Sequence, residues 1–217
     1  MKGGGSTKRQ KEQHGAARAP EPLRRDWLVI GLAAAGFAVS LYLTMTKIAG
    51  ANALFCEGSG GCQTVQASRY AMFIGIPTAA WGMALYALIG VLAYLGLPQR
   101  RWLWVFGFAV SGVAFAAYLT YLELVVIHAL CFYCLAAAAI AAVLLIALVV
   151  RRPGIGSRHA LTQPRRLATI GIVVAVATIA FGVAGHMADT EGTASPYQEA
   201  LARHLTDSGV IFYGAYW

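Results

Sequence analysis

Four cysteines, Cys56, Cys62, Cys131 and Cys134, form two closely spaced pairs and are the residues of this chain most suited to chemistry. The second pair forms the motif Cys131-Phe132-Tyr133-Cys134 where an apolar run begins. A Cys-x-x-Cys motif at a helix start is typical of dithiol–disulfide redox catalysts, because the helix dipole and the free N–H groups stabilise a thiolate there. A bridge across two residues closes a very small loop and stabilises a fold comparatively little. We therefore interpret this pair as redox-active, with a zinc or copper half-site as the alternative.

The first pair, Cys56 and Cys62, is separated by the glycine-rich run Glu57-Gly58-Ser59-Gly60-Gly61. Two such cysteines form either a static bridge or a shuttle that visits two partners in turn. Disulfide exchange proceeds through a mixed disulfide, so a shuttle cysteine must reach Cys131, and a Gly-Ser-Gly-Gly hinge permits this movement. We expect Cys131 to be exposed at the helix start. Cys134 should lie about 4–5 Å deeper, at about 1.5 Å per residue.

Electrons that arrive at Cys134 need an acceptor. The sequence contains no recognisable motif for haem, flavin or an iron–sulfur cluster, and no further cysteine that could hold a cluster. A lipid-soluble quinone, either ubiquinone or menaquinone, fits because it takes up the two electrons and two protons that a dithiol releases on oxidation. We expect no metal cofactor.

These cysteines must be positioned by membrane-spanning helices. The chain is 59% hydrophobic and only 12% charged, whereas soluble domains contain about 25% charged residues. Runs of about 20 apolar residues cross a bilayer as helices. The sequence therefore predicts an all-α membrane protein with five transmembrane helices, at Trp27–Ile48, Ile74–Leu97, Trp102–Ile127, Cys131–Val150 and Leu167–Met187.

Basic residues lie mostly on one side of these five helices. Fourteen precede the first helix or lie in the second-to-third and fourth-to-fifth connections, whereas the other side, leaving out Lys47 at the helix end, has only Arg69 and Arg203. The positive-inside rule then places the N-terminus in the cytoplasm and the C-terminus outside a bacterial cytoplasmic (inner) membrane. All four cysteines lie on the outer, oxidising side. The net charge of +8 reflects this topology, so no nucleic-acid partner is expected.

The composition divides the chain into four segments. They are a disordered cytoplasmic tail (1–26), a four-helix catalytic bundle (27–150) with an outer loop (49–73), a basic loop with the fifth helix (151–187), and an outer linker (188–217). Within the outer segments, Gln63–Tyr70 and Gln198–Thr206 are predicted to be short amphipathic helices. Val210–Tyr213 resembles the first strand of a soluble domain, which the sequence does not complete.

Taken together, these residues resemble the vitamin K epoxide reductase family in its bacterial form, from Trp27 to Trp217. The resemblance is carried by both cysteine pairs, Ser68-Arg69-Tyr70, and Gly75-Ile76-Pro77-Thr78. It implies a four-helix bundle around a quinone, with an accessory fifth helix that leads to a thioredoxin-like domain. Tyr213–Trp217 look like the strand that enters such a domain, although the Cys-Pro-His-Cys that follows it in the family is absent here. Residues 188–217 would therefore be a linker and the start of a truncated thioredoxin-like domain.

The resemblance also implies a role for each cysteine. Cys56 would receive electrons from a thioredoxin-like domain or protein that oxidises the thiols of exported proteins. Cys62 would form a transient disulfide with Cys131, and Cys134 would face the quinone. The resting disulfides would be Cys56–Cys62 and Cys131–Cys134.

The implied quinone pocket contains Ser68, Thr78, Ala138 and Glu123. Ala138 occupies the position of a tyrosine that contacts the naphthoquinone in the vertebrate enzyme, which favours plain quinone reduction over epoxide reduction. Glu123 is a carboxylate within an apolar run and hence a functional candidate, unless it snorkels to the interface. His128 could move protons or be an interfacial residue, and His186, Trp81, Trp102 and Trp104 look like interface or packing residues.

Two other readings fit four cysteines in a bundle. The unrelated four-helix bacterial disulfide oxidase also couples two pairs to quinone, but there the Cys-x-x-Cys comes first in the chain, and here the order is reversed. A tetraspan scaffold or transporter would use the cysteines only as structural disulfides. A transporter usually shows a charged or broken helix at the midplane, which this sequence lacks.

Overall fold

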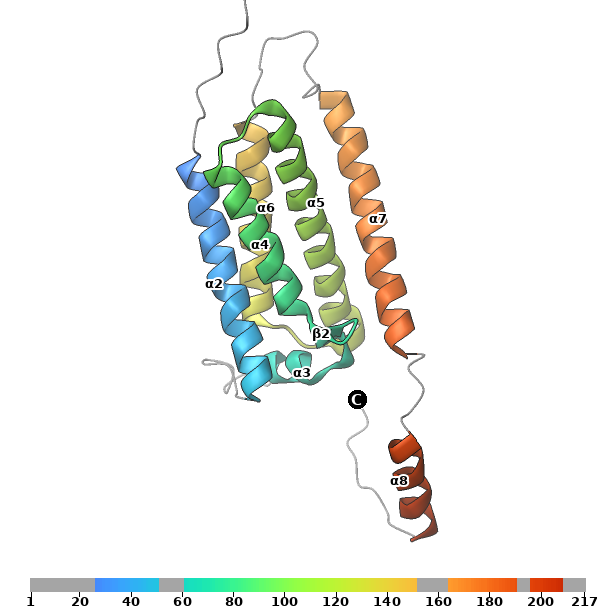
Figure 1. Cartoon of the computed structure of the whole chain (residues 1–217). Coiled ribbons are helices and arrows are strands. Elements are labelled where there is room, and N and C mark those ends of the chain that lie inside the picture. The colour runs from blue at the N-terminus through green and yellow to red at the C-terminus, as the bar shows by residue number, and fades with distance from the viewer. Residues whose placement is uncertain (1–25, 51–60, 152–163, 191–195, 209–217) are drawn as a thin grey trace, which may run out of the picture.

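The computed structural model describes residues 26–50, 61–151, 164–190 and 196–208. Four helices form a bundle, and a fifth, α7, runs alongside α5 (Figure 1). The bundle helices are α2 (Trp27–Ala49), α4 (Thr78–Tyr94), α5 (Gln99–Leu122) and α6 (Phe132–Val150), and α7 covers Pro164–Thr190. Cys56, the predicted tail except Asp26, the predicted strand and most of the basic loop lie outside the described residues.

The predicted fold class is confirmed: the chain is an all-α, multi-pass membrane protein with a four-helix bundle and one accessory helix. Four of the described helices, α2, α5 with its terminal turn, α6 and α7, are long and apolar enough to cross a membrane. The remaining bundle helix, α4, is apolar but has only 17 residues.

The predicted second helix, Ile74–Leu97, is therefore too long at both ends. Ile74 and Gly75 have φ angles of 54° and 72°, and this left-handed turn joins the short antiparallel strands β1 (Met72–Phe73) and β2 (Ile76–Pro77). At the other end, Gly96 has a φ of 85° and follows the last helical turn. Residues with a left-handed backbone conformation end a helix, and a hydropathy pattern carries no information about backbone conformation.

Two short helices cover the end of the bundle that carries the cysteines, which we call the cysteine end (Figure 1). They are α3 (Gly61–Ala67) and a 3₁₀ helix, η1 (Arg69–Ala71). Together they replace the single predicted helix Gln63–Tyr70, and Ser68, with extended backbone, separates them. Near the C-terminus, α8 (Pro196–Asp207) contains the predicted helix Gln198–Thr206.

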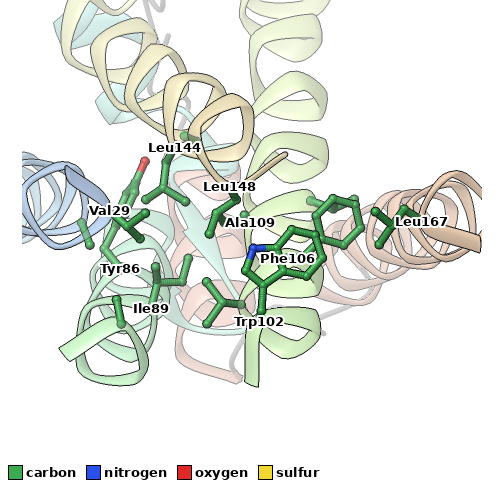
Figure 2. Packing of buried hydrophobic residues seen from close by; sticks show 14 residues of the cluster. Val29, Tyr86, Ile89, Trp102, Phe106, Ala109, Leu144, Leu148 and Leu167 are labelled. Carbon is green, nitrogen blue, oxygen red and sulfur yellow. The ribbon is translucent and has the colours of Figure 1, made fainter. Parts of the chain in front are cut away.

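The opposite half of the bundle, which we call the packed half, contains the larger of the two clusters of buried hydrophobic residues in the described structure (Figure 2). Trp102 is 1% exposed and stacks on Phe106, with ring centroids 5.4 Å apart and an interplanar angle of 11°. Leu167 joins this cluster from α7. In lipid, such close packing replaces the hydrophobic effect as the force that holds helices together.

Candidate redox site

Cys131 is the N-cap of α6, so the predicted position of the motif at a helix start is correct. Its sulfur accepts a hydrogen bond from the backbone N–H of Cys134 at 3.4 Å. Cys131 and Cys134 are present as thiols. The expectation that Cys131 is exposed is wrong, because it is 0% exposed and packs beneath α3.

Cys62, at the start of α3, lies directly against Cys131. Both are buried in one cluster, together with Val65, and the side chain of Cys62 hydrogen-bonds to Cys131. Gly61 makes this approach feasible, because a Cβ atom there would come within 2.6 Å of the Leu130 carbonyl oxygen. The structure thus brings together the two cysteines of the expected transient disulfide.

The environment of Cys131 favours its thiolate form. A hydrogen bond from the Cys134 side chain, assisted by the Cys134 backbone N–H, lowers the pKa of Cys131 to about 7 against the opposing effect of burial. A thiol with this pKa is about half ionised near neutral pH and is a good leaving group in disulfide exchange.

Glu123 lies behind the two motif cysteines and does not snorkel. It is 3% exposed, and its Oε2 accepts the backbone N–H of Cys131 at 3.2 Å. The Cys134 thiol also hydrogen-bonds to this carboxylate. Glu123 begins a π-helical turn, η2 (Glu123–Ile127), whose C-cap is the exposed His128 with a φ of 54°. The π-turn and the reversal at His128 place the carboxylate under the start of α6.

A cavity of about 260 Å³ lies beside Cys134, in the half of the bundle next to the cysteine end, which we call the cysteine half. Its lining is mostly apolar, and α2, α4, α5, α6 and α7 all contribute to it. Of the four predicted pocket residues, Thr78, Ala138 and Glu123 line this cavity. Ser68 does not: its hydroxyl donates to the Val65 carbonyl at 2.7 Å.

Several lining residues were not predicted from the sequence. Lys47 lines the cavity, and its ammonium donates to the Gln66 carbonyl, which connects the end of α2 to α3. The sequence did contain a sign of this role, because Lys47 is one of only two charged residues within the apolar runs. On the other side, the hydroxyls of Ser111 and Thr178 lie 3.0 Å apart and join α5 to α7.

The tryptophans and His186 differ in their surroundings. Trp102 is a core residue, whereas Trp104 is 63% exposed. Trp81 lines the cavity, and its indole N–H donates to the Phe73 carbonyl at 3.3 Å. His186 is buried, and its Nδ1 lies 2.9 Å from the Gly182 carbonyl oxygen. Trp102 and His186 are therefore buried packing residues, Trp104 lies at the surface, and Trp81 lines the cavity.

Comparison with known proteins agrees with this geometry. The family model described as "Vitamin K epoxide reductase family" matches residues 27–149, more than half of the chain and the whole four-helix bundle except its last residue. The thiol-disulfide oxidoreductase LTO1 of Arabidopsis thaliana is 29% identical over 199 residues, which cover 81% of this chain and 52% of LTO1. The chain thus spans about half the length of that curated relative. With its bundle, its paired cysteines and this match, the chain belongs to the vitamin K epoxide reductase family.

Proposed function

We propose that this protein is a membrane thiol–disulfide oxidoreductase that passes electrons from a thioredoxin-like protein to a quinone. The observation that carries the proposal is the linear arrangement at the cysteine end. Cys62 contacts Cys131, Cys131 contacts Cys134, and Cys134 lines the cavity. A purely structural role for the cysteines does not require this sequence of contacts or a cavity at its end.

The proposed exchange begins when the thiolate of Cys62 attacks the sulfur of Cys131 in a Cys131–Cys134 disulfide. The bond between Cys131 and Cys134 breaks, Cys134 leaves as a thiolate, and a Cys62–Cys131 disulfide forms. Cys56 then attacks Cys62, and Cys131 leaves as a thiolate. The lowered pKa of Cys131, about 7, speeds this second step because a thiol of low pKa leaves faster.

The cavity suits a quinone head group. Its apolar walls suit a flat, lipid-soluble ring, and its few polar groups, among them Thr78 and Glu123, offer hydrogen bonds. When bound, a quinone would accept the two electrons and two protons released by the dithiol. Ala138 and the neighbouring Ala137 and Ala141 keep the α6 side of the cavity open, because their side chains are small.

The direction of transfer follows from the expected topology. The fourteen basic residues on one side favour a cytoplasmic N-terminus, which places the cysteine end on the outer face of a bacterial cytoplasmic membrane. There, a thioredoxin-like domain or protein would deliver electrons from the thiols of exported proteins. The relative LTO1 is itself named a thiol-disulfide oxidoreductase, which supports the same chemistry here.

The test is to mix purified protein with a dithiol and a short-chain quinone and to follow quinol formation. We expect catalytic turnover with the wild-type protein and none with Cys134→Ala. The Cys62→Ala variant should lose turnover with a thioredoxin-like donor and retain part of it with a small dithiol that reaches Cys131 directly. A protein whose cysteines are only structural would give no turnover, and that result would reject the proposal.

A further inference from the structure

The Cys134 thiol has two hydrogen-bond acceptors. The Cys131 sulfur is one, and the Glu123 carboxylate is the other. A thiol carries a single proton, so the two acceptors compete for it. Glu123 is nearly completely buried, and it is the only carboxylate among the residues that line the described cavity.

Reoxidation of the pair removes one of these acceptors. The Cys134 thiolate released in the exchange takes up one of the two protons that the Cys56–Cys62 dithiol loses, so the reduced pair is a Cys131 thiolate and a Cys134 thiol. When the pair is oxidised, a lone pair of Cys131 enters the new S–S bond and can no longer hold the Cys134 proton, while the two electrons of the Cys134 S–H bond pass to the electron acceptor. The proton must leave at that moment, and Glu123 is the acceptor that remains in contact. Lys47, the other charged residue of the lining, cannot replace it, because an ammonium has no lone pair to accept a proton.

We propose that Glu123 is a catalytic proton carrier, which takes the proton from Cys134 as the Cys131–Cys134 disulfide forms and delivers it into the cavity. This role rests on the proposed function. One S–S bond forms, the S–H bond of Cys134 breaks, and two electrons leave the sulfur pair for the quinone. Glu123 transfers one proton, and water supplies the second, which replaces the proton that Cys131 released when it ionised.

The π-turn and one hydrogen bond hold the Glu123 carboxylate in place beside the motif cysteines. Oε2 is held by the Cys131 N–H, which fixes the side chain without neutralising it. The titratable and charged groups on the elements next to Glu123 are Cys131 and Cys134 at the start of α6, Lys47 of α2 on the same cavity wall, Cys62 of α3 against Cys131, and His128, the exposed C-cap of η2. Of these, only the two motif cysteines are observed to hydrogen-bond to Glu123.

The test compares Glu123→Gln with the wild-type protein in three measurements. The glutamine is nearly isosteric and still accepts the Cys131 N–H, but it cannot carry a proton. Quinol formation should fall by about 100-fold or more, the usual range for loss of a general acid–base group, and Glu123→Asp should recover part of it. Formation of the Cys62–Cys131 disulfide, trapped in a Cys56→Ala background, should be unchanged because that step does not use Glu123.

The third measurement needs no quinone. In a variant with Cys56, Cys62 and Cys131 all replaced by alanine, Cys134 is the only thiol, and its S–H stretching band reports its hydrogen bond. Glu123→Gln should move this band to higher wavenumber, because a bond to a charged acceptor is stronger than one to a neutral amide. An unshifted band, or wild-type turnover in Glu123→Gln, would overturn the role of Glu123. Absence of quinol formation by the wild-type protein would reject the proposed function, and this role with it.

Discussion

The two halves of the bundle are built from the same helices but are packed in opposite ways. In the packed half, large side chains such as Trp102, Ile89 and Leu144 pack between the helices and are each 1% exposed (Figure 2). In the cysteine half, α6 contributes alanines instead, and a cavity of about 260 Å³ remains. The packed half can hold the helices in place, so the other half need not be filled and can accommodate a ligand.

The largest expected effect is on stability, in the packed half. Replacing Trp102 by alanine leaves a large void, so we expect the free energy of unfolding to fall by about 3–5 kcal/mol. Thermal unfolding in detergent measures this loss. The matched control is Trp104→Ala on the same helix, where the side chain is exposed and the change should stay within about 0.5 kcal/mol. Equal losses in the two variants would contradict the assigned core.

In the cysteine half, filling the space should affect turnover instead. Ala138→Phe places a ring in the cavity, and we expect quinone-linked turnover to fall about 100-fold, equivalent to about 2.7 kcal/mol at 1.4 kcal/mol per tenfold. The trapped Cys62–Cys131 disulfide should still form. Ala139→Phe, on the exposed side of α6, should leave turnover unchanged. If Ala138→Phe retained wild-type turnover, the cavity would not be the acceptor site.

The contact between the outer loop and α6 can be loosened by one methyl group. Gly61→Ala brings a Cβ within 2.6 Å of the Leu130 carbonyl oxygen, so α3 must shift and Cys62 must move away from Cys131. In a Cys56→Ala background, we expect the Cys62–Cys131 disulfide to form about tenfold more slowly, measured by peptide mapping over time. Gly107→Ala, where the added Cβ meets nothing within 4 Å, is the control and should have no such effect.

The thiol exchange in the cysteine half should depend on pH. The pKa of Cys131 is lowered to about 7, so its thiolate fraction rises from about one tenth at pH 6 to about nine tenths at pH 8. The release of Cys131 from the mixed disulfide should already be fast at neutral pH, where an ordinary thiol of pKa about 8.5 is a poorer leaving group. Because Cys131 is buried, its ionisation is followed by the ultraviolet absorbance of the thiolate in a Cys56→Ala, Cys62→Ala variant, which should give a midpoint near 7. A midpoint above 8 would show that the hydrogen bonds from Cys134 do not stabilise the thiolate.

The smallest effect is expected at the surface, at the edge of the packed half. Arg151 and Asp26 form an ion pair at 3.2 Å with both side chains partly exposed. Such pairs contribute about 0–1 kcal/mol, so Asp26→Asn should lower the free energy of unfolding by less than about 1 kcal/mol and leave turnover intact. A loss as large as that of Trp102→Ala would mean that the ends of α2 and α6 depend on this pair.

Hydropathy and charge were sufficient to predict the all-α membrane fold and most of the helices, because a membrane span needs a long apolar run. The position of the Cys-x-x-Cys motif at the start of α6 was predicted for the same reason. The ends of α4 were missed because they depend on left-handed residues, among them Ile74, a residue type that rarely adopts this conformation.

Three features of the site could not be read from local sequence. The burial of Cys131 results from the way α3 folds over it, which is a tertiary contact between segments about 70 residues apart. The position of Glu123 depends on a π-turn, for which apolar periodicity gives no signal. The contribution of Thr178 to the cavity depends on the packing of α7 against α5, whereas the sequence predicted α7 only as an accessory helix.

The place of α7 in the cavity wall bears on inhibitor selectivity. Thr178 and Phe181 line the cavity, yet they lie outside residues 27–149, the segment that matches the family. A compound confined to the bundle residues would contact only the segment that matches the family model. A compound extended toward Thr178 and Phe181 would also contact α7, where differences between proteins of this family would change its affinity.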